Sequence, residues 1–310
     1  MDKRFAHLSV MAEVAPPLVV TDPNATYVDA TFGRGGHSRR ILSLLSSQGR
    51  LFTFDRDPQA IESSKEIQDS RFTAIHAPFS RMKEELFMRG VEHVAGVFMD
   101  IGVSSPQIDD ASRGFSFRMD GPLDMRMDRD QSLTAYEIVN NWPREELKSI
   151  LYEYGEERYA PQIAAAIERV RTDRPIETTL ELVDIIRSAM PPSALREKQH
   201  PAKRSFQAIR IAVNGELDAL PPMLEAAVSH LNAGGRLAVI SFHSLEDRII
   251  KKTMQELATG CTCPPNFPVC VCGKTPKIRL VSRKPIVSGD AELAENPRAR
   301  SAKLRVAEKL

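Results

Sequence analysis

YVDATFGRGGHS, residues 27–38, begins as an apolar strand, opens into three glycines and continues into a helical pattern up to Leu45. A glycine turn between a strand and a helix lets the backbone approach a ligand, because no side chain blocks it. In a parallel sheet such a turn lies at the carboxyl end of its strand, where ligands bind. The spacing is not G-x-G-x-x-G, since Ser38 stands at the last position, so an ordinary turn is the alternative.

Apolar, β-type runs alternate with helical patterns on both sides of this stretch. Runs at residues 50–54, 71–76 and 93–101 follow it, and helical faces separate them. Further runs lie at 236–242, 277–281 and 302–306. This rhythm predicts an α/β fold built on a parallel, doubly wound sheet.

The rhythm stops at Ser104. Residues 105–130 show no clean period, and the segment that follows carries helical faces without a strand-like run as far as residue 199. We therefore predict a discontinuous sheet domain, 1–104 and 206–310, interrupted by an all-helical domain at 105–205. The loop at 113–128 is long and rich in arginine, aromatic residues and methionine, which favours a lid or substrate loop over an irregular surface loop.

Composition excludes some classes of protein. The chain has 310 residues, 42% of them hydrophobic and 27% charged, with a formal net charge of +1. A global positive field is absent, so a nucleic-acid substrate needs a local basic patch. No apolar run is long enough to span a membrane, and the first twenty residues lack the apolar core of a signal peptide. We expect a cytoplasmic protein that does not bind membranes.

Acidic residues at the ends of two strands indicate the kind of cofactor. Asp55 ends the second run, 22 residues after Gly33, where a carboxylate can accept both hydroxyls of a ribose. NAD, FAD and S-adenosylmethionine all satisfy this pattern, and a simple strand-end cap is the alternative. S-adenosylmethionine has cationic groups and no phosphate, so Asp29 at the end of the first run favours a methyltransferase over a nucleotide-dependent oxidoreductase.

The fourth run ends in an acid and a small-residue turn. Asp100 is followed by a turn that contains Ser104, Ser105 and Pro106, and Ser105-Pro106 resembles half of the Asp/Asn/Ser-Pro-Pro-aromatic turn of amino-group methyltransferases. That turn accepts hydrogen bonds from an exocyclic NH₂ group and orients its lone pair. The second proline and the aromatic residue are missing here. These four residues are our catalytic candidates, and a tight turn leaving the sheet is the alternative.

Basic residues in three places could contact nucleic acid. Lys203, Arg204 and Arg210 surround the start of a predicted helix, where the helix dipole also favours phosphate. Arg126 lies in the long loop, and His243 lies in a polar turn directly after the fifth run. A solvated basic helix end explains the first group equally well.

Four cysteines lie within twelve residues, as Cys261-x-Cys263 and Cys270-x-Cys272. This clustering does not resemble a dispersed disulfide framework. The four thiolates could bind one zinc ion, although zinc sites more often use C-x₂-C pairs. Free thiols and a redox pair are the alternatives.

Seven segments, taken in order, closely resemble the bacterial ribosomal RNA small-subunit methyltransferase H family, the 16S rRNA cytosine-N4 methyltransferases. The segments are DATFGRGGHS at 29–38, FDRDPQAI at 54–61, DIGVSSPQID at 100–109, RGFSFRMDGPLDMRMD at 113–128, FQAIRIAVNGEL at 206–217, SFHSLEDR at 241–248 and ENPRARSAKLR at 295–305.

The resemblance implies a Rossmann-like class I methyltransferase sheet with an inserted all-helical domain. It implies methyl transfer from S-adenosylmethionine to N4 of one cytosine in the decoding region, near the P site, of 16S rRNA in the small ribosomal subunit. An RNA-binding assembly factor that retains the cofactor pocket, and a homodimeric assembly, stay open. The family's cofactor positions correspond to Gly35, Gly36, His37, Asp55, Phe79, Asp100 and Gln107.

Overall fold

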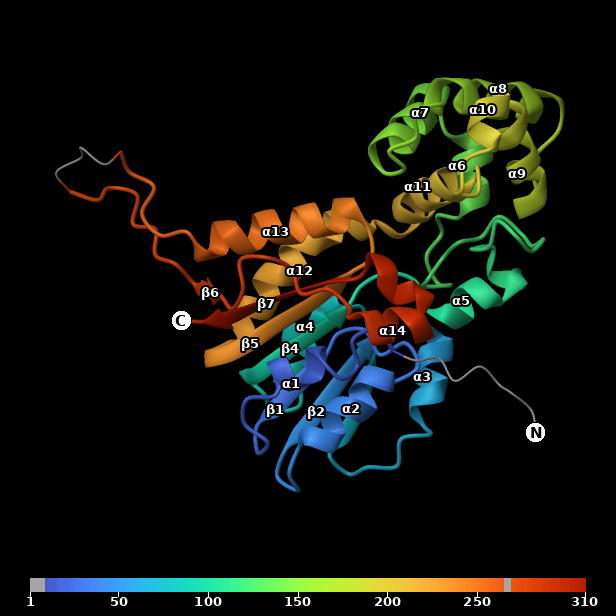
Figure 1. The fold of residues 1–310 in the computed structure, drawn as a ribbon. Helices are drawn as coiled ribbons and strands as arrows, with labels where there is room; N and C mark the ends of the chain where they lie inside the picture. The colour runs from blue at the N-terminus through green and yellow to red at the C-terminus, as the bar shows by residue number, and fades with distance from the viewer. Residues whose placement is uncertain (1–8, 265–268) are drawn as a thin grey trace. The chain divides into compact units, whose positions relative to one another are not determined.

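The computed structural model describes residues 9–264 and 269–310 (Figure 1). The described chain forms two compact units. The first unit takes the residues up to Gly102 and those from Leu217 onward, and the second unit is Val103–Glu216. No described helix is both long and apolar enough to cross a bilayer.

The first unit is built on a seven-stranded sheet of order β3-β2-β1-β4-β5-β7-β6. Neighbouring strands from β3 to β5 pair in parallel, whereas β7 is antiparallel to both β5 and β6. The sheet confirms the Rossmann-like class I methyltransferase fold. The strands are β1 (Thr26–Asp29), β2 (Arg50–Asp55), β3 (Phe72–His76), β4 (Val94–Asp100), β5 (Leu231–Ser241), β6 (Ile278–Leu280) and β7 (Lys303–Lys309).

Helices cover both faces of this sheet. On β5, Ala238 and Ile240 belong to one core cluster together with Ile41 of α2. Leu237 and Val239 point to the opposite face and are also fully buried. Figure 1 shows α12 and α13 on that side of the sheet, away from α1 and α2. The helices are α1 (Ala15–Val19), α2 (Gly36–Leu44), α3 (Pro58–Ser64), α4 (Met82–Phe87), α12 (Glu216–His230), α13 (Ser244–Ala258) and α14 (Asp290–Glu295), with 3₁₀ turns η1 (Phe79–Arg81) and η3 (Pro297–Ser301).

The fifth strand is longer than its apolar pattern predicts. It begins at Leu231, which pairs with Val94, and the register then shifts so that Arg236 pairs with Gly96. Residues 232–235, Asn-Ala-Gly-Gly, look like a helix stop in the sequence, because asparagine and glycine are typical of helix C-termini. In the structure they continue β5 through this irregularity instead.

The second unit is helical and has its own core. Thr178 and Glu181 form a capping box at the start of α9, as local sequence rules favour. Apolar residues of several helices and of the preceding loop make up the core. The elements are α5 (Ser105–Asp109), η2 (Ala111–Arg113), α6 (Ala135–Asn141), α7 (Arg144–Glu153), α8 (Ala160–Asp173), α9 (Thr179–Ser188), α10 (Pro192–Leu195) and α11 (Lys203–Asn214).

The boundary between the units differs from the one that the sequence suggested. We expected the sheet domain to resume at residue 206. The structure instead includes Phe206, Ile209 and Val213 in the core of the helical unit. The reason is that the apolar face of α11 packs on α6 and α7, so the chain leaves this unit only after the helix ends.

Candidate active site

The glycine turn follows β1, as predicted, and Asp29 organises it. One carboxylate oxygen, Oδ1, accepts a hydrogen bond from the Thr31 amide at 3.1 Å, and Oδ2 accepts one from the Ser38 hydroxyl at 2.6 Å. Burial raises the pKa of Asp29 to about 6. Asp29 therefore connects the end of β1 to the turn and to α2 by hydrogen bonds, and both of its carboxylate oxygens are used within the protein.

The glycines of the turn do not all serve the same purpose. Gly33 and Gly35 have φ of +56° and +74°, in the left-handed region that favours glycine. A Cβ atom on Gly35 would lie 2.6 Å from the Phe32 ring, and one on Gly36 would collide with Ser9. A Cβ atom on Gly33 would have nothing within 4 Å. The clearance that a ligand needs is therefore found at Gly33, whereas the protein's own packing requires Gly35 and Gly36.

His37 is buried between the turn and the end of β4. Its Nε2 lies 2.8 Å from the Val10 carbonyl oxygen, and its Nδ1 lies 3.5 Å from Asp100 Oδ2. Burial lowers the pKa of His37, which favours the neutral ring. Because a carbonyl oxygen can only accept, Nε2 carries the proton and Nδ1 directs a lone pair towards Asp100. His37 thus contacts protein groups through both of its nitrogens.

Asp100 has one oxygen without a partner. Its Oδ1 is buried and accepts no hydrogen bond from the residues that the structure describes. Burial, with a smaller contribution from the charge of Glu246, raises the pKa of Asp100 to about 7. A buried acceptor without a donor costs about 1–3 kcal/mol, so this oxygen indicates a place for a ligand donor.

Asp55 connects the second strand to the glycine turn. Its Oδ2 accepts a hydrogen bond from the Gly33 amide at 2.8 Å, and its Oδ1 accepts one from the Asp57 amide at 2.9 Å. Burial raises the pKa of Asp55. Each carboxylate oxygen has a further lone pair, so both remain able to accept hydrogen bonds from hydroxyl groups. The carboxylate lies beside the one glycine of this turn that leaves open space.

Phe79 and Gln107 are both buried, but in different units. Phe79 begins η1 after β3 and meets Phe54 edge to face, with 6.0 Å between ring centroids. Gln107 lies in α5, where its Oε1 accepts a hydrogen bond from the Ser104 amide at 3.0 Å. Phe79 is a core residue of the sheet unit, and Gln107 stabilises the start of a helix.

The turn after β4 becomes the start of α5. Ser104 is the N-cap residue, Gln107 completes a capping box, and Pro106 lies in the first turn. Serine at the cap and proline in the first turn are typical of helix N-termini. Local structure therefore accounts for the Ser104-Ser105-Pro106 sequence, and the catalytic role of these residues stays a prediction.

His243 caps a helix. It precedes α13, and its Nδ1 lies 3.4 Å from the Glu246 amide. The side chain of Glu246 accepts hydrogen bonds from the amides of Phe242 at 2.8 Å and His243 at 3.2 Å. The Nδ1 atom is thus engaged within the turn, and Nε2 lies 2.9 Å from Glu246 Oε1. Nε2 is nevertheless buried without a hydrogen-bond partner among the residues described, and an RNA contact of His243 stays a prediction.

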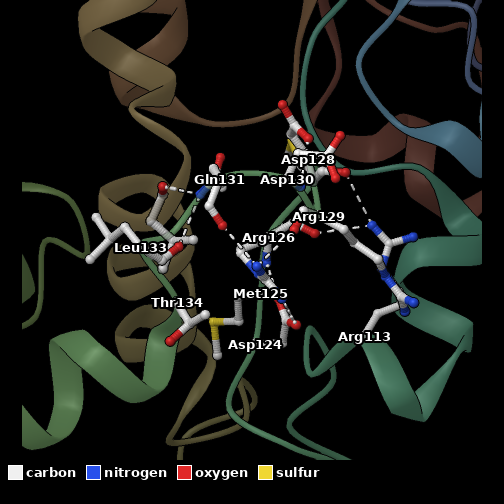
Figure 2. A network of polar contacts seen from close by, with 12 residues as sticks. Arg113, Asp124, Met125, Arg126, Asp128, Arg129, Asp130, Gln131, Leu133 and Thr134 are labelled. Carbon is white, nitrogen blue, oxygen red and sulfur yellow. Dashed lines mark hydrogen bonds and ion pairs between the residues drawn. The ribbon is translucent and has the colours of Figure 1, made fainter. Parts of the chain in front are cut away.

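The Arg126 guanidinium, predicted to contact RNA, is occupied by the protein's own groups (Figure 2). Its Nε and Nη2 each lie 2.9 Å from an oxygen of Asp124. Its Nη1 donates to the carbonyl oxygens of Arg129 and Gln131, both at 2.8 Å. Four of the five N–H groups of an arginine are used in this way, so Arg126 shapes the loop.

Two residues that the sequence did not single out fasten the same loop. Arg113 is only 1% exposed, and its Nη2 donates to the carbonyls of Arg126 and Met127 at 3.0 and 3.2 Å. Asn214, at the end of α11, accepts from the Met127 amide and donates to the Met125 carbonyl, both at 2.8 Å. The burial of an arginine is difficult to infer from sequence. Asparagine followed by Gly215 does indicate the end of a helix, where a polar side chain can hydrogen-bond a neighbouring loop.

The loop at 113–128 is a packed part of the helical unit. Phe115, Leu123, Met125 and Met127 are buried in its core. The mixture of aromatic residues and methionine that suggested a lid thus reflects core packing.

Of the three basic residues predicted around the start of α11, Lys203 and Arg204 lie there, whereas Arg210 lies in the second half of the helix. Arg210 forms a two-pronged ion pair with Glu216, with two N–O distances of 2.8 Å. Lys203 is exposed and Arg204 is partly exposed. Neither side chain forms an ion pair or hydrogen bond with the residues described. Lys203 and Arg204 are therefore the predicted RNA contacts that have cationic groups available.

Asp55 and Asp100 are the predicted cofactor residues of the sheet unit whose chemistry fits S-adenosylmethionine, and Gly33, which was not among the predicted residues, fits it as well. The other predicted residues of this unit are engaged in the protein's own packing, namely Gly35, Gly36, His37 and Phe79. Asp100 offers a buried acceptor without a donor, Asp55 retains acceptor capacity, and Gly33 has open space beside it. The buried carboxylates suit a ligand with cationic groups and oppose a pyrophosphate.

Comparisons with known proteins agree along the whole chain. A profile of the MraW methylase family matches residues 4–310. A protein of Paenibacillus sp. (strain JDR-2) is 50% identical, over 99% of this chain and 100% of the relative. A protein of Geobacter sulfurreducens is 51% identical, over 99% of each chain. Both relatives are named ribosomal RNA small subunit methyltransferase H. The chain belongs to the MraW methylase family.

Proposed function

We propose that this protein transfers a methyl group from S-adenosylmethionine to N4 of one cytosine in the decoding region of 16S rRNA. The name shared by relatives that are half identical over the full chain supports an rRNA substrate in the small subunit. The observation on which the proposal depends most is the buried Oδ1 of Asp100, an acceptor without a donor at the carboxyl end of β4.

The sheet unit supplies the cofactor site in this proposal. S-adenosylmethionine would provide an electrophilic methyl group there. Asp55 would accept the ribose hydroxyls, since its oxygens already fix the Gly33 and Asp57 amides in position. The open space at Gly33 lets the backbone approach the ligand, and Asp100 accepts a hydrogen bond from a donor group.

The helical unit and the turn after β4 serve the RNA. Lys203 and Arg204 contact phosphates, because their charges are not used within the described structure. Carbonyl and hydroxyl oxygens of the Ser104-Ser105-Pro106 turn accept hydrogen bonds from the cytosine amino group, which leaves the N4 lone pair free to attack a methyl group. Positioning contributes much of the rate in this scheme, since the methyl donor is already reactive.

Methylation of reconstituted small subunits with labelled S-adenosylmethionine tests the proposal. We expect one labelled N4-methylcytidine, located in the decoding region by nuclease digestion and mass spectrometry. Label on a ribosomal protein, on another base, or on neither would contradict it. Naked 16S rRNA, assayed in parallel, establishes whether the assembled subunit is the substrate.

Two rival functions predict different results. An oxidoreductase would bind NAD or FAD, which a cofactor titration detects directly. An RNA-binding assembly factor would lose methylation through Asp55→Ala while the cellular phenotype stays normal.

A chain with the proposed substrate would work in the cytoplasm. Sedimentation equilibrium measures whether the chain is a monomer or a homodimer.

A further inference from the structure

The connection between α13 and β6 brings all four cysteines together. The Sγ atoms of Cys261, Cys263, Cys270 and Cys272 all lie within 4.8 Å of one another. The Cys261–Cys270, Cys270–Cys272 and Cys272–Cys261 sulfur distances are 3.4, 3.6 and 3.7 Å. Two short C-x-C segments thus converge on one point, although six residues separate them in the chain.

These distances agree with a tetrahedral metal site. A Zn–S bond of about 2.3 Å with tetrahedral angles puts neighbouring sulfurs about 3.8 Å apart. A disulfide bond would require about 2.05 Å. All four cysteines are free thiols in the structure, and these three sulfur–sulfur distances lie close to the tetrahedral value.

Apolar packing does not explain the convergence. No described residue between 260 and 277 is buried, and Val269 and Val271 are 69% and 72% exposed. Ordering each residue of such a segment costs about 1–2 kcal/mol of backbone entropy. The Lys277 amide donates to the Leu257 carbonyl at 2.8 Å and closes the base of the segment, but it does not hold its far end. A bound metal is the cross-link that would offset this cost.

Backbone amides surround the sulfurs. The Val271 amide lies 3.4 Å from Cys263 Sγ, and the amides of Thr262 and Lys274 donate to Cys272 Sγ. Amide donors of this kind stabilise metal-bound thiolates and are typical of the second shell of such sites.

We propose that Cys261, Cys263, Cys270 and Cys272 bind one Zn²⁺ ion as a closed, four-thiolate structural site. Binding converts four thiols to thiolates, forms four Zn–S bonds and releases four protons to the solvent, without oxidation or reduction. With four protein ligands the ion has no open position for a substrate, so the site cross-links the chain and performs no catalysis. The site lies outside the residues assigned to methyl transfer, so the test of zinc binding does not depend on the proposed function.

Metal analysis of the full chain, purified under reducing conditions without chelator, tests the site. We expect about one zinc per chain, and stoichiometric release of zinc when a mercurial reagent titrates the thiols. Replacement by Co²⁺ should give the intense visible bands of a tetrahedral thiolate complex. Iron in place of zinc, a metal-free chain, disulfide bonds found by mass spectrometry, or the weak spectrum of octahedral Co²⁺ would each overturn the proposal.

Matched variants separate the ligands from their surroundings. The double substitution Cys261→Ser with Cys270→Ser should remove the zinc, whereas Thr262→Ser, between two ligands, should retain it. Loss of zinc should also increase the rate of limited proteolysis within residues 259–277 by tenfold or more, with the rest of the chain resistant. Equal zinc content in all three proteins would contradict the assignment.

Discussion

Oδ2 of Asp100 lies 3.5 Å from Nδ1 of His37, whose Nε2 is held by the carbonyl of Val10. The histidine therefore offers Asp100 a lone pair. A protonated Asp100 can donate a hydrogen bond to that lone pair. An ionised Asp100 has no proton to donate, so the carboxylate and the Nδ1 lone pair form no hydrogen bond. We therefore expect the protonation state of this carboxyl to affect stability and, under the proposed function, cofactor binding.

The first prediction concerns stability and pH. The pKa of Asp100 is raised from 3.8 to about 7, so between these values the folded chain holds a proton that the unfolded chain has released. Asp100 therefore stabilises the fold at low pH, and this contribution is lost as pH rises through 7. The free energy of unfolding of the wild type, relative to Asp100→Asn, should fall by about 2–3 kcal/mol between about pH 5 and pH 8.

Urea denaturation at each pH measures this difference. His37 has a lowered pKa and acts in the opposite direction in the wild type, but both proteins contain it, so the comparison isolates Asp100. Asp69→Asn is the control, because the pKa of Asp69 is lowered to about 2 and the residue does not titrate in this range. An equal pH dependence in wild type and Asp100→Asn would contradict the prediction.

The second prediction concerns cofactor affinity. If ionised Asp100 accepts a hydrogen bond from a cationic group of S-adenosylmethionine, binding should tighten about tenfold between about pH 5.5 and 7. The amino group of the cofactor stays charged in this range. Isothermal titration calorimetry should give a flat pH dependence for Asp100→Asn. A slope preserved in that variant would mean that another group titrates.

The third prediction compares two glycines of one turn. Gly33→Ala places a methyl group in open space at positive φ, so its cost should be about 1–2 kcal/mol of backbone strain. Gly35→Ala adds a collision with Phe32, and its cost should be larger by about 1–3 kcal/mol. Cofactor affinity, measured in the folded state, should suffer more in Gly33→Ala. The reverse order of stability would contradict the packing described here.

The fourth prediction separates RNA contacts from structural arginines. Lys203→Ala with Arg204→Ala should leave stability unchanged, weaken RNA binding and reduce the slope of log affinity against log salt by about 2. Arg126→Ala should lower the free energy of unfolding by about 2–3 kcal/mol, because Asp124 and two carbonyls lose their donor. Filter binding at several salt concentrations, with urea denaturation, measures both. A reduced salt slope for folded Arg126→Ala would reassign that residue to the RNA.

The fifth prediction concerns the fastening of the loop. Asn214→Ala leaves the Met127 amide and the Met125 carbonyl without their partner in a buried position. We expect a loss of about 2–4 kcal/mol in the free energy of unfolding, measured with urea. Asn141→Ala, at an exposed helix end of the same unit, is the control and should change it by less than about 0.5 kcal/mol.

The sequence predicted what local chemistry determines. Strand and helix rhythm predicted the sheet, and the strand ends carry Asp29, Asp55 and Asp100 as expected. The sequence did not predict contacts between residues that are distant from one another in the chain. Gly36 is required by Ser9, 27 positions away, and the lone pair of His37 meets Asp100, 63 positions away. No window of sequence contains both members of such a pair.

Charged residues illustrate the same limit. Arg126 and Arg210 look like phosphate ligands in the sequence, because their charge is visible and their partners are not. The structure pairs them with Asp124 and Glu216. Those carboxylates lie nearby in the chain, but only the geometry of the loop and the helix end decides that they meet.

The position of β7 sets an order of events during synthesis. β7 is the last described strand in the chain, yet it lies between β5 and β6, and β6 pairs with no other described strand. The helical unit, in contrast, is one contiguous segment that ends before β5 begins. A nascent chain leaving the ribosome can therefore complete the helical unit while the sheet still lacks the strand that joins its edge. The helical unit, with the proposed RNA contacts Lys203 and Arg204, would then be complete before the sheet that carries the proposed cofactor site.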